Sequence, residues 1–245
     1  MNRRLLILLA VAAAAALAGA EESTEIDAAD IVQRADERQQ YETAYMEARM
    51  VNTDQFGSKT IEYVAWAKGS SFLMEFRSDA EYGQRILRTD GRIYHFFPDS
   101  ETVFTRGQGD SVVGLISYDD VTNEDNLLDN YTASIDGEDT IDGVETYRIR
   151  LEARPRRRVA YPNQLVWIEK ETSIIRRVEM YTRSMQALKT MEVREVTEAD
   201  GVLVPTDMLL TDEVRESVTS EIFIEDLEIG VSIPDSRFTR RALTR

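Results

Sequence analysis

The stretch GRIYHFFPDSETVF, residues 91–104, is the part of the sequence that decides the fold. It predicts two short strands around a turn at Pro98-Asp99-Ser100. Asp90-Gly91, at the start of the stretch, predicts a second tight turn, because both residues tolerate positive φ. The stretch is rich in aromatic residues, although the chain carries a formal net charge of −16. The aromatic hairpin therefore belongs either to an ordinary core or to a binding surface.

Hairpins follow one another on both sides of this stretch. In residues 71–78, Phe72, Met74 and Phe76 share one face, because side chains alternate along a strand. Four Asp-Gly pairs, at 90–91, 136–137, 142–143 and 200–201, give further hairpin signals. We therefore predict about ten to eleven mostly antiparallel strands in a mainly β (α+β) fold. Besides the hairpin 91–104, the predicted strands cover residues 45–54, 61–68, 71–78, 84–89, 145–154, 163–171, 174–184, 189–198, 203–212 and 220–230.

The first residues, MNRRLLILLAVAAAAALAGA, have the layout of a signal peptide. Arg3 and Arg4 precede an apolar run over residues 5–17, and Ala18-Gly19-Ala20 fits a cleavage site. An uncleaved membrane anchor is the alternative, but the apolar run is shorter than the about 20 residues that a bilayer span needs. We therefore expect a cleaved signal peptide over residues 1–20 and a single domain over residues 21–245.

Composition excludes several kinds of chemistry. The chain has no cysteine, so it has no disulfide, no catalytic thiolate and no cysteine metal ligand. Its strong negative charge argues against nucleic acid, whose phosphates would be repelled. The same acidity is also what a protein from a salty habitat would carry.

Three segments fall outside the strand pattern. Residues 29–44 predict a helix with Ile31, Val32, Ala35 and Arg38 on one face. Residues 105–131 predict a long loop with one or two short helices, which is either a binding lid or a packed crossover. The basic stretch Arg154–Arg158 is either a solvated hairpin tip or a contact for an acidic partner or a phosphate head group.

The sequence contains little that indicates catalysis. His95 is the one histidine, and its place on an aromatic strand favours a packed ring over a catalytic base. There is no nucleophile elbow and no phosphate-binding loop. Acidic pairs such as Asp119-Asp120 and Glu124-Asp125 carry no sign of burial. We therefore do not expect an enzyme, a metal or a cofactor.

A sheet of ten or more strands has to curl or close, and its concave face would then carry one residue of each alternating pair. The residues 29–44 and 105–131 could fill the opening completely, as a core, or loosely, leaving a cavity. The candidates for this face are the large apolar residues Trp66, Phe72, Met74, Phe76, Phe96, Ile149, Leu151, Trp167, Val178 and Met180.

Several motifs, in this order and spacing, resemble the outer-membrane lipoprotein-sorting protein family, the LolA-like periplasmic carriers. The resemblance covers nearly all of the mature chain. It includes the aromatic strand and Pro98 turn, Ser117–Val121, the strand Val166–Lys170 and the closing Phe238–Leu243. The matching segments are residues 29–40, 82–106, 114–121, 129–154, 164–181 and 234–243.

This resemblance implies a single half-open β-barrel with a helical lid, LolA/LolB-like, in the periplasm. Its cavity would take lipoprotein acyl chains or other lipids for transfer towards the outer membrane. An inner-membrane transporter and an outer-membrane acceptor would be the partners. The alternative is an envelope regulatory or structural module that uses the same fold to bind a protein partner.

The resemblance also suggests that the aromatic hairpin forms part of the cavity wall. Tyr94 and Phe96 would then line it together with the candidates above. A shift of one residue in register would instead place Ile93, His95 and Phe97 there.

Overall fold

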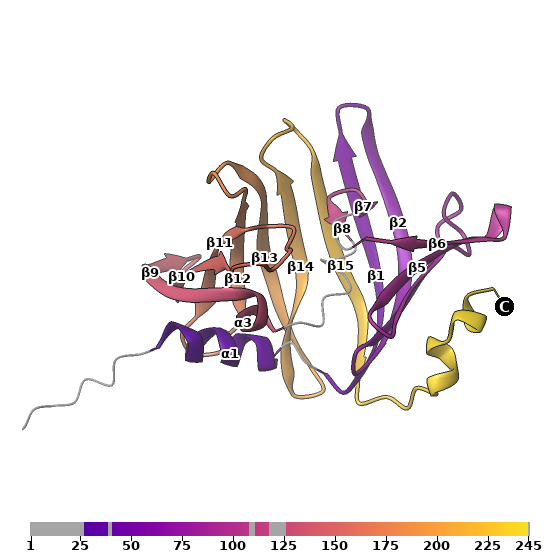
Figure 1. Ribbon diagram of the computed structural model, residues 1–245, viewed down its shortest axis with the longest axis horizontal. Helices are drawn as coiled ribbons and strands as arrows, with labels where there is room; N and C mark the ends of the chain where they lie inside the picture. The colour runs from indigo at the N-terminus through magenta and orange to yellow at the C-terminus, as the bar shows by residue number, and fades with distance from the viewer. Residues whose placement is uncertain (1–26, 39–40, 108–110, 118–125, 245) are drawn as a thin grey trace, which may run out of the picture.

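An antiparallel sheet of 13 strands carries most of the residues that the structure describes (Figure 1). The computed structural model describes residues 27–38, 41–107, 111–117 and 126–244. The predicted signal peptide and the acidic pairs at 119–120 and 124–125 lie outside these ranges. No helix in the described ranges is long enough and apolar enough to cross a lipid bilayer.

The sheet consists of two meanders in which each strand pairs with the next one along the chain. The first meander contains β1 (Thr43–Asp54), β2 (Gly57–Lys68), β3 (Ser71–Phe76), β4 (Arg85–Thr89), β5 (Arg92–Phe97) and β6 (Thr102–Arg106). The second contains β9 (Tyr131–Ile141), β10 (Val144–Ala153), β11 (Asn163–Glu169), β12 (Ile175–Tyr181), β13 (Ala187–Ala199), β14 (Val202–Asp212) and β15 (Thr219–Ile229).

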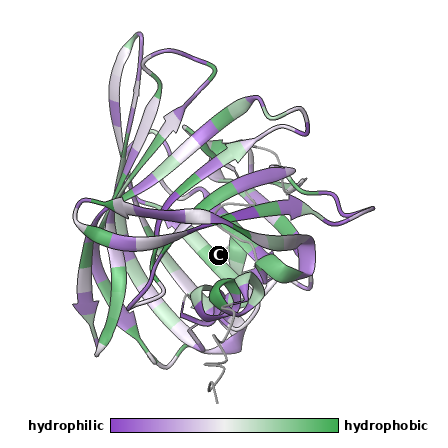
Figure 2. Cartoon of the chain, turned by 90° about the vertical axis from the view of Figure 1, so that its left-hand side faces the viewer, coloured by the Kyte–Doolittle hydropathy of each residue, from purple (hydrophilic) through white to green (hydrophobic). Residues whose placement is uncertain are grey.

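One pair of strands, β1 and β15, joins the two meanders into one sheet. Their antiparallel register runs from Ala44 opposite Ile229 to Thr53 opposite Thr219. The free edges of the sheet are β6 and β9, so the sheet curls without closing. Figure 2 shows the strands curving around an interior. The predicted antiparallel half-barrel is therefore confirmed, with more strands than expected.

The predicted strands omit β9 of the large sheet, and an Asp-Gly pair explains this error. Three of the four pairs form turns with positive φ at both residues, as at Asp90 (51°) and Gly91 (65°). Asp136-Gly137 instead lies inside β9, where the pairing with β10 shifts by one residue. The Asp136 carboxylate accepts hydrogen bonds from Arg148 and Arg150 on β10, so the pair forms a β-bulge and not a turn.

The helix α1 (Ala28–Arg38) lies on the inner face of the second meander. Asp27 Oδ1 accepts the Ala29 N–H at 3.0 Å and so caps the helix. The buried face, Ala28, Ile31, Val32 and Ala35, is the one that the spacing predicts. It packs on Ile149, Leu151, Val166, Ile168, Val178 and Met180. The helix ends at Arg38, earlier than the predicted residue 44, because residues 43–54 pair as β1.

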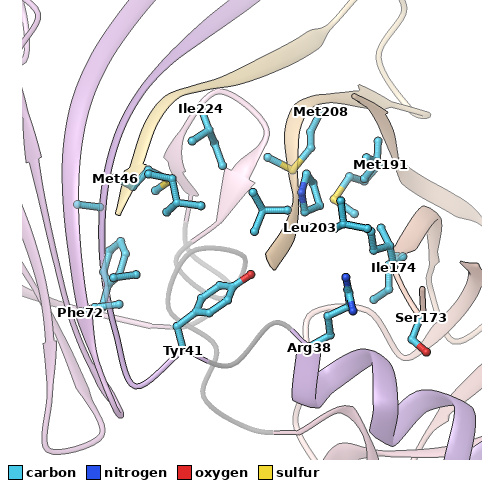
Figure 3. Close-up of a pocket in the computed structure, with 18 residues that line it drawn as sticks. Arg38, Tyr41, Met46, Phe72, Ser173, Ile174, Met191, Leu203, Met208 and Ile224 are labelled. Atoms are coloured by element: carbon cyan, nitrogen blue, oxygen red, sulfur yellow. The ribbon is translucent and has the colours of Figure 1, made fainter. Parts of the chain in front are cut away.

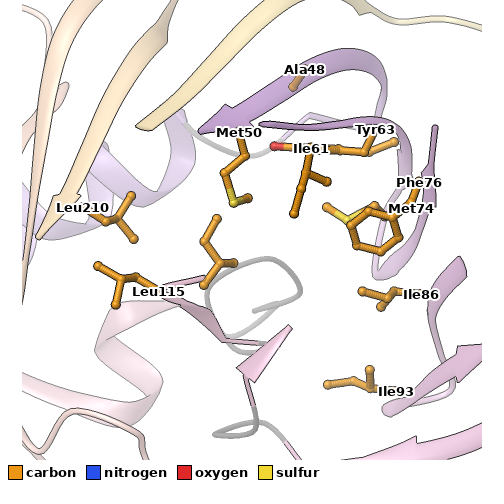
Figure 4. Packing of buried hydrophobic residues seen from close by; sticks show 12 residues of the cluster. Ala48, Met50, Ile61, Tyr63, Met74, Phe76, Ile86, Ile93, Leu115 and Leu210 are labelled. Carbon is orange, nitrogen blue, oxygen red and sulfur yellow. The ribbon is translucent and has the colours of Figure 1, made fainter. Parts of the chain in front are cut away.

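The small hairpin of β7 (Ser111–Val113) and β8 (Ile116–Ser117) lies on the inner face of the first meander. Its buried Leu115 and Ile116 belong to a cluster with Met50, Phe76 and Leu210 (Figure 4). The short helix α3 (Leu127–Asn130) follows it in the chain. The predicted loop over 105–131 thus supplies both a β-hairpin and one helical turn.

The C-terminal residues cover the outer face of the first meander. They form two 3₁₀ turns, η2 (Asp235–Phe238) and η3 (Arg240–Thr244); a third turn, η1 (Pro98–Ser100), joins β5 to β6. Ile233, Phe238 and Leu243 are buried against Leu73, Leu87, Tyr94 and Phe96. The strands β3 to β5 are therefore covered on both faces, which explains the aromatic content of residues 91–104.

The basic loop Arg154–Arg158 joins β10 to β11, and its residues are exposed. Arg154 is fixed to α3, because its Nε donates to the Leu128 carbonyl at 2.9 Å. Among the described residues, no ion pair involves the arginines of this loop. Its proposed contact with an acidic partner or a phosphate group stays a prediction.

Asp36 should make the stability of the protein depend on pH. Its Oδ2 accepts the Leu127 N–H at 2.8 Å and so joins α1 to α3. Burial is the main cause that raises the pKa of Asp36, to about 6, and the Asp129 charge adds to it. The Asp36 carboxyl therefore binds its proton more tightly in the folded protein than in the unfolded chain. This protonation contributes its full amount to the free energy of unfolding below about pH 4, and the contribution is lost as pH rises through 6.

We expect Asp36→Asn to raise the melting temperature more at pH 8 than at pH 5. Because the carboxylate is only partly buried, solvent screens its charge, and we expect the difference between the two pH values to be about 1 kcal/mol. This corresponds to about 2–4 °C in melting temperature. Thermal denaturation followed by circular dichroism measures this difference. Asp30→Asn, on the exposed side of α1, is the control and should change both temperatures equally. An equal effect of Asp36→Asn at both pH values would contradict the assignment.

Candidate functional site

A cavity of about 400 Å³ lies on the inner face of the sheet, where the two meanders meet (Figure 3). The strands β1, β2, β13, β14 and β15 supply most of its lining. Its volume lies within the range of small-molecule sites, about 300–1,000 Å³. The lining residues are Arg38, Tyr41, Ala44, Met46, Ala65, Ala67, Phe72, Ser173, Ile174, Ile175, Met191, Val193, Leu203, Val204, Pro205, Met208, Ile224 and Leu227.

Small side chains on neighbouring strands leave this space open. Ala44 on β1 lies opposite Ala67 on β2, and Met46 lies opposite Ala65. Further along the same two strands, larger residues such as Met50 and Ile61 fill the interior under the β7–β8 hairpin. The hollow therefore follows from a local change in side-chain size on one continuous face.

Flexible apolar side chains from the neighbouring strands complete the lining. Met191 and Met208 come from β13 and β14, and Ile224 comes from β15 (Figure 3). Methionine has an unbranched, polarisable side chain, which adapts to ligands of different shape. The cavity is thus chemically suited to a flexible hydrocarbon.

Polar groups gather at the end of the cavity nearest α1. Figure 3 shows the Arg38 guanidinium and the Tyr41 phenol pointing into the cavity, with Ser173 at its border. The Nε of Arg38 is buried and has no hydrogen-bond partner among the described residues. Burial raises the pKa of Tyr41, and the nearby Arg38 charge opposes this effect. The phenol is therefore protonated at neutral pH and can donate a hydrogen bond.

The structure distributes the predicted site residues over four regions, three of them on the inner face of the sheet. Phe72 lines the cavity. Met74 and Phe76 share its sheet face and pack in the cluster with the β7–β8 hairpin. On the same face, the residues beneath α1 are Ile149, Leu151, Val178 and Met180.

Four predicted residues lie on the outer face and do not line this cavity. Trp66, Tyr94 and Phe96 pack against the C-terminal turns. Trp167 donates its Nε1–H to Asp139 Oδ2 at 3.3 Å, and Arg177 lies over its ring. Of the two sets left open in the hairpin, Ile93, His95 and Phe97 share the inner face, because Ile93 packs in the inner cluster. Both faces of these strands carry apolar residues because the C-terminal turns bury the outer face as well.

The prediction missed the small and flexible residues that shape the cavity. It selected large apolar side chains, which tend to fill space and not to leave it. The signal that could have found the site is the spacing Ala44-x-Met46 on one strand and Ala65-x-Ala67 on the next. Small residues that face each other on two paired strands indicate a place where side chains do not fill the interior.

His95 is a packed ring. The centroid of its ring lies 4.1 Å from the centroid of the Phe97 ring, and its Nε2 is 3.1 Å from Gln84 Oε1. Burial, followed by the charge of Arg106, lowers the pKa of His95 to about 4. Within the described ranges, no group of three or more acidic, histidine or cysteine side chains could hold a metal ion.

Polar contacts fix the β7–β8 turn to the sheet beside the cavity. The Leu115 N–H donates to Ser220 Oγ at 3.0 Å, and the Leu115 carbonyl accepts from Lys189 Nζ at 2.5 Å. Ser220 in turn donates to Asn52 Oδ1 at 2.6 Å. The turn therefore rests on β1, β13 and β15, the strands that also form the cavity.

The fold and cavity together define a class of protein: a half-open antiparallel barrel with apolar space between the sheet and its inner cover. Solved structures share this fold. A LolA superfamily protein from Nitrosomonas europaea has a TM-score of 0.75 at 20% identity, over 89% of this chain and 99% of that one. A Vibrio parahaemolyticus domain named for outer membrane lipoprotein sorting has a TM-score of 0.77 at 16% identity, over 89% and 100%.

A DUF1329 family protein from Desulfovibrio piger has a TM-score of 0.80 at 21% identity, over 87% of this chain and 96% of that one. These likenesses show that the fold is LolA-like, as the sequence motifs indicated. No curated protein matches the chain. A family model described as "Uncharacterized protein" matches residues 68–245, and the chain belongs to that family.

We expect Gly114→Ala to weaken the attachment of the β7–β8 turn. Gly114 has a φ of 55°, and an added Cβ would lie 2.0 Å from Asn52 Oδ1 and 2.6 Å from Ser220 Oγ. Relief of this clash would displace the turn, at a cost of about 1–3 kcal/mol in the free energy of unfolding. Denaturant unfolding measures the cost, and hydrogen exchange at Leu115 locates it.

Gly91→Ala is the matched control for this experiment. Gly91 also has a positive φ, of 65°, but an added Cβ would meet nothing within 4 Å. It therefore reports the backbone strain alone. Equal losses in the two variants would show that the turn does not rest closely on Asn52 and Ser220.

Proposed function

We propose that this protein is a carrier that shelters the hydrocarbon chain of a lipid, or of a lipoprotein, in the cavity between the two meanders. The observation that carries the proposal is the open apolar space lined by Met46, Phe72, Met208 and Ile224. Each buried CH₂ group contributes about 0.8 kcal/mol, so a hydrocarbon chain needs such shelter to cross water. The LolA-like fold agrees with this role.

The proposal includes a cellular location and a route of transport. The predicted signal peptide over residues 1–20 would export a mature domain of residues 21–245 to the periplasm. Cargo would pass from an inner-membrane transporter to an outer-membrane acceptor. A regulatory module that binds a protein partner is the competing function, and it does not require an internal hollow. The cavity therefore favours the carrier.

Native mass spectrometry of the mature protein, purified from its own periplasm, tests the proposal. We expect lipid or acylated protein to accompany the chain at near one-to-one, and extraction would then identify the cargo class. A ligand-free protein that also fails to take up a fluorescent fatty acid would contradict the carrier. Co-purification of a non-acylated protein partner would favour the regulatory module.

We expect Met208→Gln to lower the affinity for an uncharged hydrocarbon probe by about tenfold. The substitution keeps the length of the side chain but places an amide in the cavity, where it costs about 1–3 kcal/mol. Titration of a fluorescent probe into the purified variant measures the loss. Because the new group is neutral, the result does not depend on the charge of the ligand.

Leu209→Gln is the matched control on the other face of β14. Leu209 pairs with Glu192 and Glu221 on the neighbouring strands, and it does not line the cavity. The control should bind the probe like the unmodified protein. If both variants bound equally well, hydrocarbon would not occupy this cavity.

A further inference from the structure

The polar groups of the cavity are concentrated at one end and carry a positive charge. Arg38 is the last residue of α1, three residues after the buried Ala35 and seven after Ile31. This helical spacing turns its side chain toward the interior. Among the described residues that line the cavity, no carboxylate is present to balance the guanidinium.

The Arg38 guanidinium has an unsatisfied donor among the described residues. A guanidinium keeps its charge and carries five N–H donors. The Nε of Arg38 is buried without a hydrogen-bond partner among the described residues, and no ion pair of Arg38 is found there. The carbonyl end of α1 offsets part of the charge. A buried donor of this kind is stabilised when a ligand supplies the missing oxygen.

Tyr41 provides a second donor beside Arg38. Its phenol points into the same end of the cavity (Figure 3). Because burial raises the pKa of Tyr41, its O–H stays available to an anionic oxygen at neutral pH. Ser173 adds a hydroxyl at the border. One cation and two hydroxyls at the end of an apolar cavity match an acidic head group on a hydrocarbon chain.

The cavity has room for a hydrocarbon chain. Its volume of about 400 Å³ lies within the range of small-molecule sites, about 300–1,000 Å³.

We infer that the cavity binds an amphiphile with a hydrocarbon chain and an anionic head group, whose oxygens contact Arg38 and Tyr41. This inference rests on the proposed carrier function and specifies its ligand. The head group is a carboxylate or a phosphate, since both present oxygens that a guanidinium binds in the same way. The chain extends from this end toward Met208 and Ile224.

The test compares three ligands of equal chain length on the mature chain, residues 21–245, at pH 8. They are dodecanoate, dodecyl phosphate and dodecan-1-ol, and each displaces an uncharged fluorescent hydrocarbon probe. We expect one or both anionic ligands to bind at least about tenfold more tightly than the alcohol. The tighter of the two anions identifies the source of the head group.

The variants Arg38→Gln and Arg34→Gln assign the preference to one side chain. Arg38→Gln should lose about tenfold or more in affinity for the anion and bind the alcohol as before. Retained alcohol binding shows that this variant is folded. Arg34 is exposed on the same helix, so Arg34→Gln should change neither affinity. Tyr41→Phe should weaken anion binding by a smaller factor.

Two results overturn the inference in different ways. If the unmodified protein bound the alcohol as tightly as the anions, the head-group site would be refuted, and the carrier function would stand. If the anions were preferred but Arg38→Gln changed nothing, the preference would lie elsewhere. Failure of all three ligands and of the probe would refute the carrier function itself.

Discussion

The pairing of β1 with β15 is the contact on which the rest of the structure depends. It joins residues near the start of the described chain to residues near its end, and it turns two local meanders into one curled sheet. Such a distant pairing has a high entropic cost of closure, so the neighbouring hairpins must supply much of the stability first. The same two strands form the floor of the cavity through Met46, Ile224 and Leu227. The cavity therefore exists only when the meanders have met.

Among the described residues, the hollow lies at this junction, between the two inner covers of the sheet. The helix α1 covers the second meander, and the β7–β8 hairpin covers the first. Between them, Ala44, Ala65 and Ala67 replace the larger residues that fill the rest of the inner face. A packed interior normally leaves few voids larger than a water molecule. The half-open apolar cavity of about 400 Å³ is a hollow in this packing, and the proposed hydrocarbon ligand would fill it.

Alternation along the strands was sufficient to predict the sheet class and most hairpins, but three local contacts were invisible to it. The Asp136-Gly137 pair became a bulge because Arg148 and Arg150 hold the aspartate. The predicted helix extends past Arg38 because the helical spacing of apolar residues gives no sign that residues from Thr43 onward pair with β2. The cavity lining could not be chosen from the hairpin 91–104, because the C-terminal turns bury its second face. Each miss reflects a contact between segments distant in the sequence.

The balance of energies explains why two polar side chains would govern which ligand the proposed carrier retains. Burial of a 12-carbon chain contributes about 10 kcal/mol, at about 0.8 kcal/mol for each CH₂. Association costs about 4–15 kcal/mol in lost motion and ordering. The cost is of the same order as the gain, so contacts at the head group have a large effect on the net affinity. Contacts at Arg38 and Tyr41 would then decide which amphiphile is retained.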